Sequence, residues 1–347
     1  MSCPPAPTDT VMLTEAEQEC VEEIMLHAWG EDTQLAYRAG LLMWHCFCNE
    51  KGVPKEERAP AAQTLVSAFI AHLMVAYSGK TISGYLSGVQ VWHILNGLQW
   101  DLDKKVLDTM LCVADRLTPS SSKRKKHQPY THNFIAAVQA HLDLNKPLDT
   151  VVYACLATCF YASVRLSKFT AQMLAAFSLN THVTPQHLSY DQDCNGLRVT
   201  VLHIPRTKAA GNEGEDMFWA TQEGNMDPTA ALAQHFRVNQ PSIASHLFTY
   251  KAMNTCHTPT KVKFLERVEE AALAAGLEPL QGHRIRIRST LEYLLRGVPF
   301  DIMKAKGRWA GDSFQLYLQK HTIVITPYIQ ATPIHKGFVR YTMPLVR

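Results

Sequence analysis

Apolar positions recur with the spacing of α-helices over most of the chain. A capping-box pattern at Thr14 and Glu17 predicts a first helix, and a second is expected from Asp32 or Thr33. One apolar stripe of the second helix is its expected core face: Leu35, Ala39, Leu42 and Cys46. Segment 59–77 and segment 78–97, with an N-cap at Ser78 or Thr81, predict two more helices. We expect four or five helices before Leu117 and no strand.

The pattern changes in the second half of the chain. Segment 118–129 is polar, basic and closed by proline, which is typical of a linker between domains. Helical periodicity returns over 130–177, and then 197–204 alternates as a strand. A long turn over Pro205–Asp216 leads to a partner strand at 217–221, so a β-hairpin is expected. Helices resume at Asp227 and dominate to Leu318, before an irregular tail.

These patterns predict a mostly α-helical protein with a small β-sheet, which agrees with its length of 347 residues. An all-helical N-terminal domain precedes an α+β domain. The expected division is a flexible tail at 1–13, a helical domain at 14–117, a basic linker at 118–129, an α+β domain at 130–321 and a C-terminal tail at 322–347.

Composition excludes several classes of protein. Hydrophobic residues make up 46% of the chain and charged residues 19%, as in folded globular proteins. No apolar run is long enough to span a bilayer, and no secretory signal is visible, so we expect no membrane partner. The nine cysteines form no disulfide or zinc pattern and are expected to be reduced, mostly buried thiols. Sixteen histidines lack an HExxH motif, and neither a metal nor another cofactor is expected.

Charge is distributed unevenly, although the net charge is only +3. Residues 1–34 carry eight acids and no lysine or arginine, whereas 282–308 carries seven basic residues against two acids. A second basic run consists of Lys123, Arg124, Lys125 and Lys126. This asymmetry suggests a polyanionic partner on one side of the molecule, with ordinary solvated surface charge as the alternative.

Four features follow one another in the second half. Arg165 ends an apolar helical run, Lys208 lies in the turn of the hairpin, His283 and Arg286 are three residues apart on one helical face, and Trp309 precedes Tyr317 by eight residues. Each has an ordinary explanation when taken alone. The arginine would cap a helix, the lysine would be solvated, the His–Arg pair would lie at a surface, and the tyrosine would border the core.

Together, in this order and spacing, these residues resemble the active site of the tyrosine recombinases, the superfamily of phage integrases and the Cre recombinase. The flanking sequence suggests a Crypton-type mobile-element enzyme within it. The resemblance covers Tyr130 to about His321 and implies that 130–321 is a catalytic domain and 14–117 a core-binding domain. It also implies that segment 322–347 docks on a neighbouring protomer; packing within its own chain is the alternative.

The resemblance implies phosphoryl transfer without a metal, through a covalent 3′-phosphotyrosine at Tyr317. Two arginines suit a phosphate because each guanidinium binds bidentately and stays charged, and each could contribute roughly 3 kcal/mol in the transition state. Ionising tyrosine at neutral pH costs about 4 kcal/mol, which the positive field of Arg165, Arg286 and His283 would reduce. His283 is the expected base or proton relay, Lys208 the general acid, and Trp309 a donor of its indole N–H to the phosphate.

The implied partner is double-stranded DNA, with a dimer on each site and a tetramer in synapsis. The basic linker would strap the DNA, although Lys123–Lys126 also suits nuclear localisation. The expected location is the nucleus in a eukaryote and the cytoplasm otherwise. Further expected DNA contacts are Lys80, Thr81, Tyr85 and Arg206; for Lys80 and Tyr85, capping and packing are equally good explanations.

One position departs from the family. An acid commonly follows the first arginine by three residues, and here that position is Lys168. A lysine would repel Arg165 where an acid would orient it, so we hypothesise weakened catalysis with retained DNA binding. Two alternatives to a site-specific recombinase stay open. One is a type IB topoisomerase-like enzyme, which shares much of this active site, and the other, suggested by Lys168, is a catalytically weakened DNA-binding protein derived from a recombinase.

Overall fold

The computed structural model describes residues 29–122, 132–171, 177–193, 195–207, 210–253, 255–279 and 283–309, without the side chains of residues 31, 32, 283 and 284. The chain divides into two compact units, Met1–Lys126 and His127–Arg347. The boundary between them falls inside segment 118–129. Each unit has its own hydrophobic core and is described by itself.

The first unit contains α-helices and no strand between residues 29 and 122. They are α2 (Glu31–Glu50), α3 (Gln63–Leu73), α4 (Gly79–Leu95) and α5 (Lys104–Arg116), with short 3₁₀ turns at Lys55–Glu57 and Ser120–Ser122. Helix α2 begins at Glu31, one or two residues before the predicted start, and the Ser78 N-cap of α4 confirms a second prediction. The helix predicted from Thr14 lies outside the described residues.

The predicted core face of α2 is wrong. Leu35 and Leu42 are 57% and 64% exposed, while Trp44 and Phe47 lie in the core of this unit. Aromatic side chains bury more apolar area than leucines, and these two also pack against the ring of Phe69. The helix is therefore turned so that its aromatic residues face inward and the stripe of smaller residues faces outward.

Helices α2 and α4 cross closely because a glycine stands on each side of the crossing. A Cβ atom on Gly40 would lie 2.5 Å from the backbone oxygen of Tyr85, and one on Gly88 would overlap the backbone of Tyr37. Any larger residue at either position would separate the two helices. This crossing fixes the direction of α4, whose first two turns carry Lys80, Thr81 and Tyr85, the DNA contacts expected in this unit.

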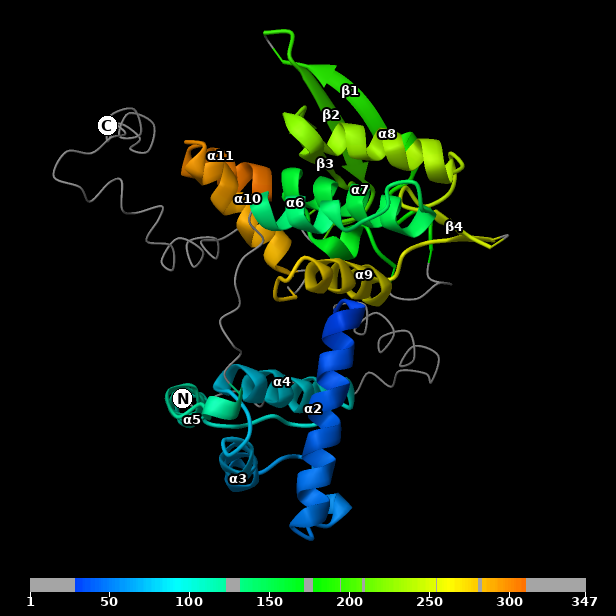
Figure 1. Cartoon of the computed structure of the whole chain (residues 1–347). Helices are drawn as coiled ribbons and strands as arrows, with labels where there is room; N and C mark the ends of the chain where they lie inside the picture. Colours follow the sequence, from blue (N-terminus) through cyan, green and yellow to red (C-terminus); the bar gives the residue numbers. More distant parts are fainter. Residues whose placement is uncertain are drawn as a thin grey trace, which may run out of the picture. The chain divides into compact units, whose positions relative to one another are not determined.

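The second unit combines helices with a three-stranded antiparallel sheet, β1-β2-β3, and a two-stranded one, β4-β5 (Figure 1). Its helices are α6 (His132–Ala140), α7 (Pro147–Tyr161), α8 (Pro228–Asn239), α9 (Lys261–Ala274), α10 (His283–Leu295) and α11 (Phe300–Gly307). Its strands are β1 (Leu188–Gln192), β2 (Arg198–Ile204), β3 (Glu215–Ala220), β4 (Tyr250–Ala252) and β5 (Thr255–His257). Short 3₁₀ turns lie at Leu166–Lys168, Pro185–His187 and Gly224–Met226. The prediction of a mostly α-helical protein with a small sheet is confirmed.

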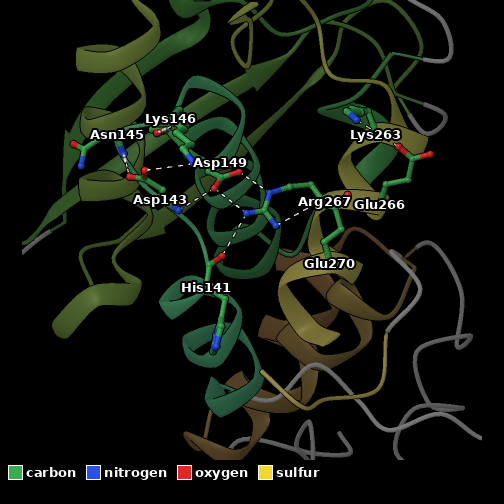
Figure 2. A network of polar contacts seen from close by, with 10 residues as sticks. His141, Asp143, Asn145, Lys146, Asp149, Lys263, Glu266, Arg267 and Glu270 are labelled. Carbon is green, nitrogen blue, oxygen red and sulfur yellow. Dashed lines mark hydrogen bonds and ion pairs between the residues drawn. The ribbon is translucent and has the colours of Figure 1, made fainter. Parts of the chain in front are cut away.

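Helix α7 is the centre of this unit, and its side chains from Asp149 to Tyr161 are all buried. Near its start, Asp149 receives two hydrogen bonds from Arg267 of α9, with lengths of 2.6 and 2.8 Å (Figure 2). The backbone N–H of Asp143 donates a third bond to the same carboxylate, at 2.9 Å. The α7 N-terminus, the preceding loop and α9 are thereby joined through one buried ion pair.

The sheet has the order β1-β2-β3, and its inner face packs on α7 and α8. The predicted hairpin corresponds to β2 and β3, in which Ile204 pairs with Glu215. Strand β3 begins before the predicted position, so Glu215 belongs to the strand and not to the turn. Along β3 the residues that face inward alternate, beginning with Glu215 and continuing with Met217 and Trp219. The strands β1, β4 and β5 were not predicted.

Three properties expected from composition can be compared with the structure. Of the six described cysteines, Cys46, Cys112 and Cys256 are exposed, so the prediction of mostly buried thiols is wrong for this part of the chain. The helices among the described residues include none with the length and apolarity that crossing a bilayer requires. The same residues contain no cluster of histidine, cysteine and acidic side chains suited to a metal ion.

Candidate active site

Three segments that carry predicted site residues meet in the second unit. They are the turn after α7, which leads to Arg165, helix α10, which contains His283 and Arg286, and the end of α11, which leads to Trp309. The hydroxyl groups of Ser163 and Ser289 form a hydrogen bond between the first two segments. Lys208 and Tyr317 lie outside the described residues, as does the side chain of His283.

Arg165 follows a sharp turn at the end of α7. Helix α7 ends at Tyr161, and Ser163 adopts a φ of 54°, a left-handed conformation that redirects the chain. Ser163 is fully buried, whereas Arg165 lies on the surface at the start of the 3₁₀ turn Leu166–Lys168. The buried turn therefore presents an exposed guanidinium at the border of the three segments.

Arg286 is held in place by the chain that follows α11. Its side chain is only 5% exposed, and its guanidinium lies 4.3 Å from the centre of the Trp309 ring. Its Nη2 also donates a hydrogen bond to the backbone oxygen of Gly307. A Cβ atom on Gly307 would overlap the indole ring, so the stacked arrangement requires glycine there. The structure thus places Trp309 against Arg286; donation of its indole N–H to a phosphate stays a prediction.

Arg308 is a further basic residue of this site that the motif search missed. It adopts a φ of 53° at the end of α11, which turns its side chain toward the sheet. Its Nε lies 3.8 Å from the Glu215 carboxylate, and its Nη2 lies 3.5 Å from the backbone oxygen of Ser163. Burial lowers the pKa of Arg308 to about 10, with Glu215 acting in the opposite direction and Arg165 adding to the decrease.

Lys168 reaches from the Arg165 turn to the start of the turn that joins β2 and β3. Its Nζ donates a 2.8 Å hydrogen bond to the backbone oxygen of Arg206. Burial lowers the pKa of Lys168, and the charges of Arg165 and Arg206 lower it further, while Glu215 opposes them. The lysine therefore makes a specific contact with the hairpin, and weakened catalysis through Lys168 stays a prediction.

The hairpin that carries Lys208 is closed at its base. The backbone N–H of Thr207 donates to the oxygen of Gly211, and the N–H of Ala210 donates to the Thr207 hydroxyl. On the far side of β3, Lys306 of α11 donates a 2.8 Å bond to the backbone oxygen of Phe218. Burial, followed by the charge of Arg308, lowers the pKa of Lys306 to about 8. Lys168 thus attaches the hairpin to the site just after β2, and Lys306 attaches it at β3.

The DNA contacts expected in the first unit have different surroundings. Lys80 is exposed at the start of α4, while the Thr81 N–H donates to the Ser78 hydroxyl that caps this helix. Tyr85 packs edge-on against Tyr77, with 5.5 Å between the ring centres, and burial raises its pKa. Thr81 and Tyr85 thus have structural contacts of their own. The basic run 123–126 lies outside the described part of the chain, and the Arg206 side chain is exposed.

Of the comparisons with known proteins, the one with solved structures finds similar folds. No protein-family profile matches the sequence, and no curated protein matches it either. The structure is similar to that of the XerH site-specific recombinase bound to its difH substrate, with a TM-score of 0.53, 12% identity and coverage of 88% of this chain and 82% of that one. The Tn1549 transposon integrase in complex with transposon right-end DNA gives a TM-score of 0.50, with 10% identity and coverage of 87% and 93%.

These likenesses extend over both units and show the fold. The chain has the fold of the tyrosine recombinases and integrases, as the order of its motif residues implied. The Crypton-type subdivision stays a prediction.

Proposed function

We propose that this protein is a site-specific DNA recombinase that cuts and rejoins DNA through a covalent 3′-phosphotyrosine at Tyr317. The observation that carries the proposal is that the three segments bearing Arg165, Arg286 and Arg308 are hydrogen-bonded to one another, beside the hairpin that holds Lys208. A fold shared with recombinases and integrases supports it. In the two solved complexes, the related proteins are bound to DNA.

The arrangement suits an in-line attack on a phosphodiester. The guanidinium groups of Arg165 and Arg286 would bind the nonbridging oxygens, where negative charge builds up. Stacking on Trp309 keeps the Arg286 fork in one plane and one position, which avoids a reorganisation cost during the reaction.

Tyr317, His283 and Lys208 carry the nucleophilic attack and the two proton transfers. The Tyr317 oxygen forms a bond to phosphorus after giving its proton to His283, and the bond from phosphorus to the 5′-oxygen breaks. Lys208 gives a proton to that leaving oxygen. The product is a phosphotyrosine diester and a free 5′-hydroxyl, so the energy of the original bond is retained for rejoining.

The biological setting forms part of the proposal. Strand exchange requires two DNA sites, so we propose a dimer on each site, a tetramer in synapsis and a Holliday-junction intermediate. The C-terminal segment 322–347 would dock on a neighbouring protomer, and the linker 118–129 would contact the DNA backbone. A nuclear location follows for a eukaryotic host and a cytoplasmic one otherwise.

A trapping assay tests the activity. In a duplex nicked just downstream of the cleavage site, the short fragment that bears the new 5′-hydroxyl is lost after cleavage, so DNA should stay attached to the protein, and Tyr317→Phe should abolish the adduct. Retained DNA binding without an adduct would favour the second candidate, a DNA-binding protein derived from a recombinase, for which the positive charge of Lys168 beside Arg165 is the specific observation. A gain of cleavage in Lys168→Glu would show that Lys168 weakens catalysis. Relaxation of supercoils without exchange between two sites would indicate a type IB topoisomerase-like enzyme.

A further inference from the structure

Four positive side chains surround the border between the Arg165 turn and the hairpin. The charge of Arg165 lowers the pKa of both Lys168 and Arg308, and the charge of Arg206 lowers that of Lys168. Burial of Lys168 and Arg308 makes their repulsion stronger than it would be in water. Charges of one sign in such a position need an acid nearby, since an uncompensated cation would otherwise turn toward the solvent.

Glu215 is placed to supply that negative charge. It is the first residue of β3 and shares the inward face of the strand with Met217 and Trp219. Its carboxylate lies 3.8 Å from Arg308 Nε, and the side chains of the pair are 23% and 17% exposed. The same carboxylate opposes the decrease in the pKa of Lys168. Glu215, on the inner face of the sheet, thus offsets the positive charge of both Arg308 and Lys168.

We propose that Glu215 is a positioning residue of the phosphoryl-transfer site, holding Arg308 beside Arg165 and offsetting the charge of Lys168. The inference rests on the proposed function, since it assigns a role within that same site. Lys168 then belongs to a balanced arrangement, in which it ties the Arg165 turn to the hairpin through Arg206 while Glu215 supplies the negative charge from the opposite strand.

Loss of the carboxylate has a consequence that a purely structural role would not produce. Without Glu215 the site is more positive, so binding of the DNA phosphate is retained or strengthened. The guanidinium of Arg308 loses its anchor at the same time, and the chemical step slows. A split between unchanged or tighter DNA binding and slower cleavage is therefore the signature of a positioning acid.

The test uses the full chain and the nicked duplex. We expect Glu215→Gln to lower the rate of adduct formation by about tenfold, the size typical of coupling between neighbouring charged groups, without loss of DNA affinity. Glu213→Gln is the matched control, because Glu213 lies two residues away on the same hairpin and is exposed. Equal rates for Glu215→Gln and Glu213→Gln would overturn the proposal, as would a loss of DNA affinity in Glu215→Gln as large as its loss of rate.

A second measurement does not depend on cleavage. NMR titration of Lys168 after ¹³C-methyl labelling of the lysines should show a lower pKa in Glu215→Gln than in the wild type. If the wild type forms no adduct, the proposed function fails, and this titration still tests whether Glu215 offsets the charge of Lys168. If Glu215→Gln does not fold, Glu215→Asp replaces it, because the shorter acid keeps the charge at a greater distance and should lower the Lys168 pKa by less. An unchanged titration of Lys168 would overturn the proposal.

Discussion

The ion pair between Asp149 and Arg267 should be a large single contribution to the stability of the second unit (Figure 2). The two side chains are 7% and 19% exposed, so water cannot replace the lost partner well. In Asp149→Asn the bond from the Asp143 N–H is retained, but both bonds from Arg267 lose their charged acceptor. Hydrogen bonds to charged groups contribute about 1.5–3 kcal/mol each. Glu270 still pairs with Arg267, at 3.5 Å, so Arg267 keeps one acidic partner. The expected loss of unfolding free energy is therefore near the lower end for two such bonds, at about 3 kcal/mol.

Urea unfolding of the full chain, followed by circular dichroism, measures this loss. The transition of the His127–Arg347 unit should move to lower urea, while that of the other unit stays in place. Glu266→Gln is the control on the same helix, because Lys263 and Glu266 form an exposed pair at 3.7 Å. Its cost should not exceed about 0.5 kcal/mol. Equal shifts for the two variants would refute the reasoning.

The Asp149–Arg267 ion pair also predicts how the stability difference between the wild type and Asp149→Asn depends on pH. Burial alone would raise the pKa of Asp149, but the bonds from Arg267 and the Asp143 N–H outweigh it and lower the pKa below its ordinary value of 3.8. A carboxyl with a lowered pKa contributes stability above its unfolded pKa and loses it as the pH falls through the folded pKa. The gap between the wild type and Asp149→Asn should therefore be constant near neutral pH and shrink below about pH 4.

Two further predictions concern histidines and the Arg286 site. Burial lowers the pKa of His235 to about 4 and that of His246 to about 3. Both stay neutral in the folded state while the unfolded chain takes up protons, so stability should fall as the pH drops from about 6.5 to 4, by up to about 1.4 kcal/mol per pH unit for each. His246→Leu should reduce the slope of urea stability against pH by up to about 1.4 kcal/mol per pH unit, and an unchanged slope would contradict the assignment. Gly307→Ala should displace Trp309 and slow adduct formation by about tenfold, at equal DNA affinity in a binding assay; an unchanged rate would show that the stacking is dispensable.

The sequence predicted the elements of this fold better than their orientation. Helical spacing located α2, and the alternation of apolar residues located the hairpin of β2 and β3. Strand β1 escaped detection because four of its five residues are exposed, so pairing with β2 and not burial stabilises it. The orientation of α2 was wrong because periodicity counts apolar positions equally, whereas packing favours the largest side chains.

In the candidate site, the sequence likewise indicated single residues but not the contacts between them. Arg165 and Arg286 were predicted from their order in the chain, and the structure places their segments together. Arg308 and Glu215 were missed because their pairing joins residues far apart in the sequence. A signal was nevertheless present, since Glu215 stands at an inward position of β3, where an acid needs a partner. The stacking of Trp309 on Arg286 depends on Gly307, which spacing alone does not reveal.

Identification of the amino acid that becomes attached to DNA tests the central claim most directly. Full-length protein is incubated with the nicked duplex, digested with protease and analysed by mass spectrometry for a peptide that carries a nucleotide. The account predicts one such peptide, with a 3′-phosphate on Tyr317 and a free 5′-hydroxyl on the released strand. Attachment at another residue, attachment through a 5′-phosphate, or DNA binding without any attached peptide would contradict it.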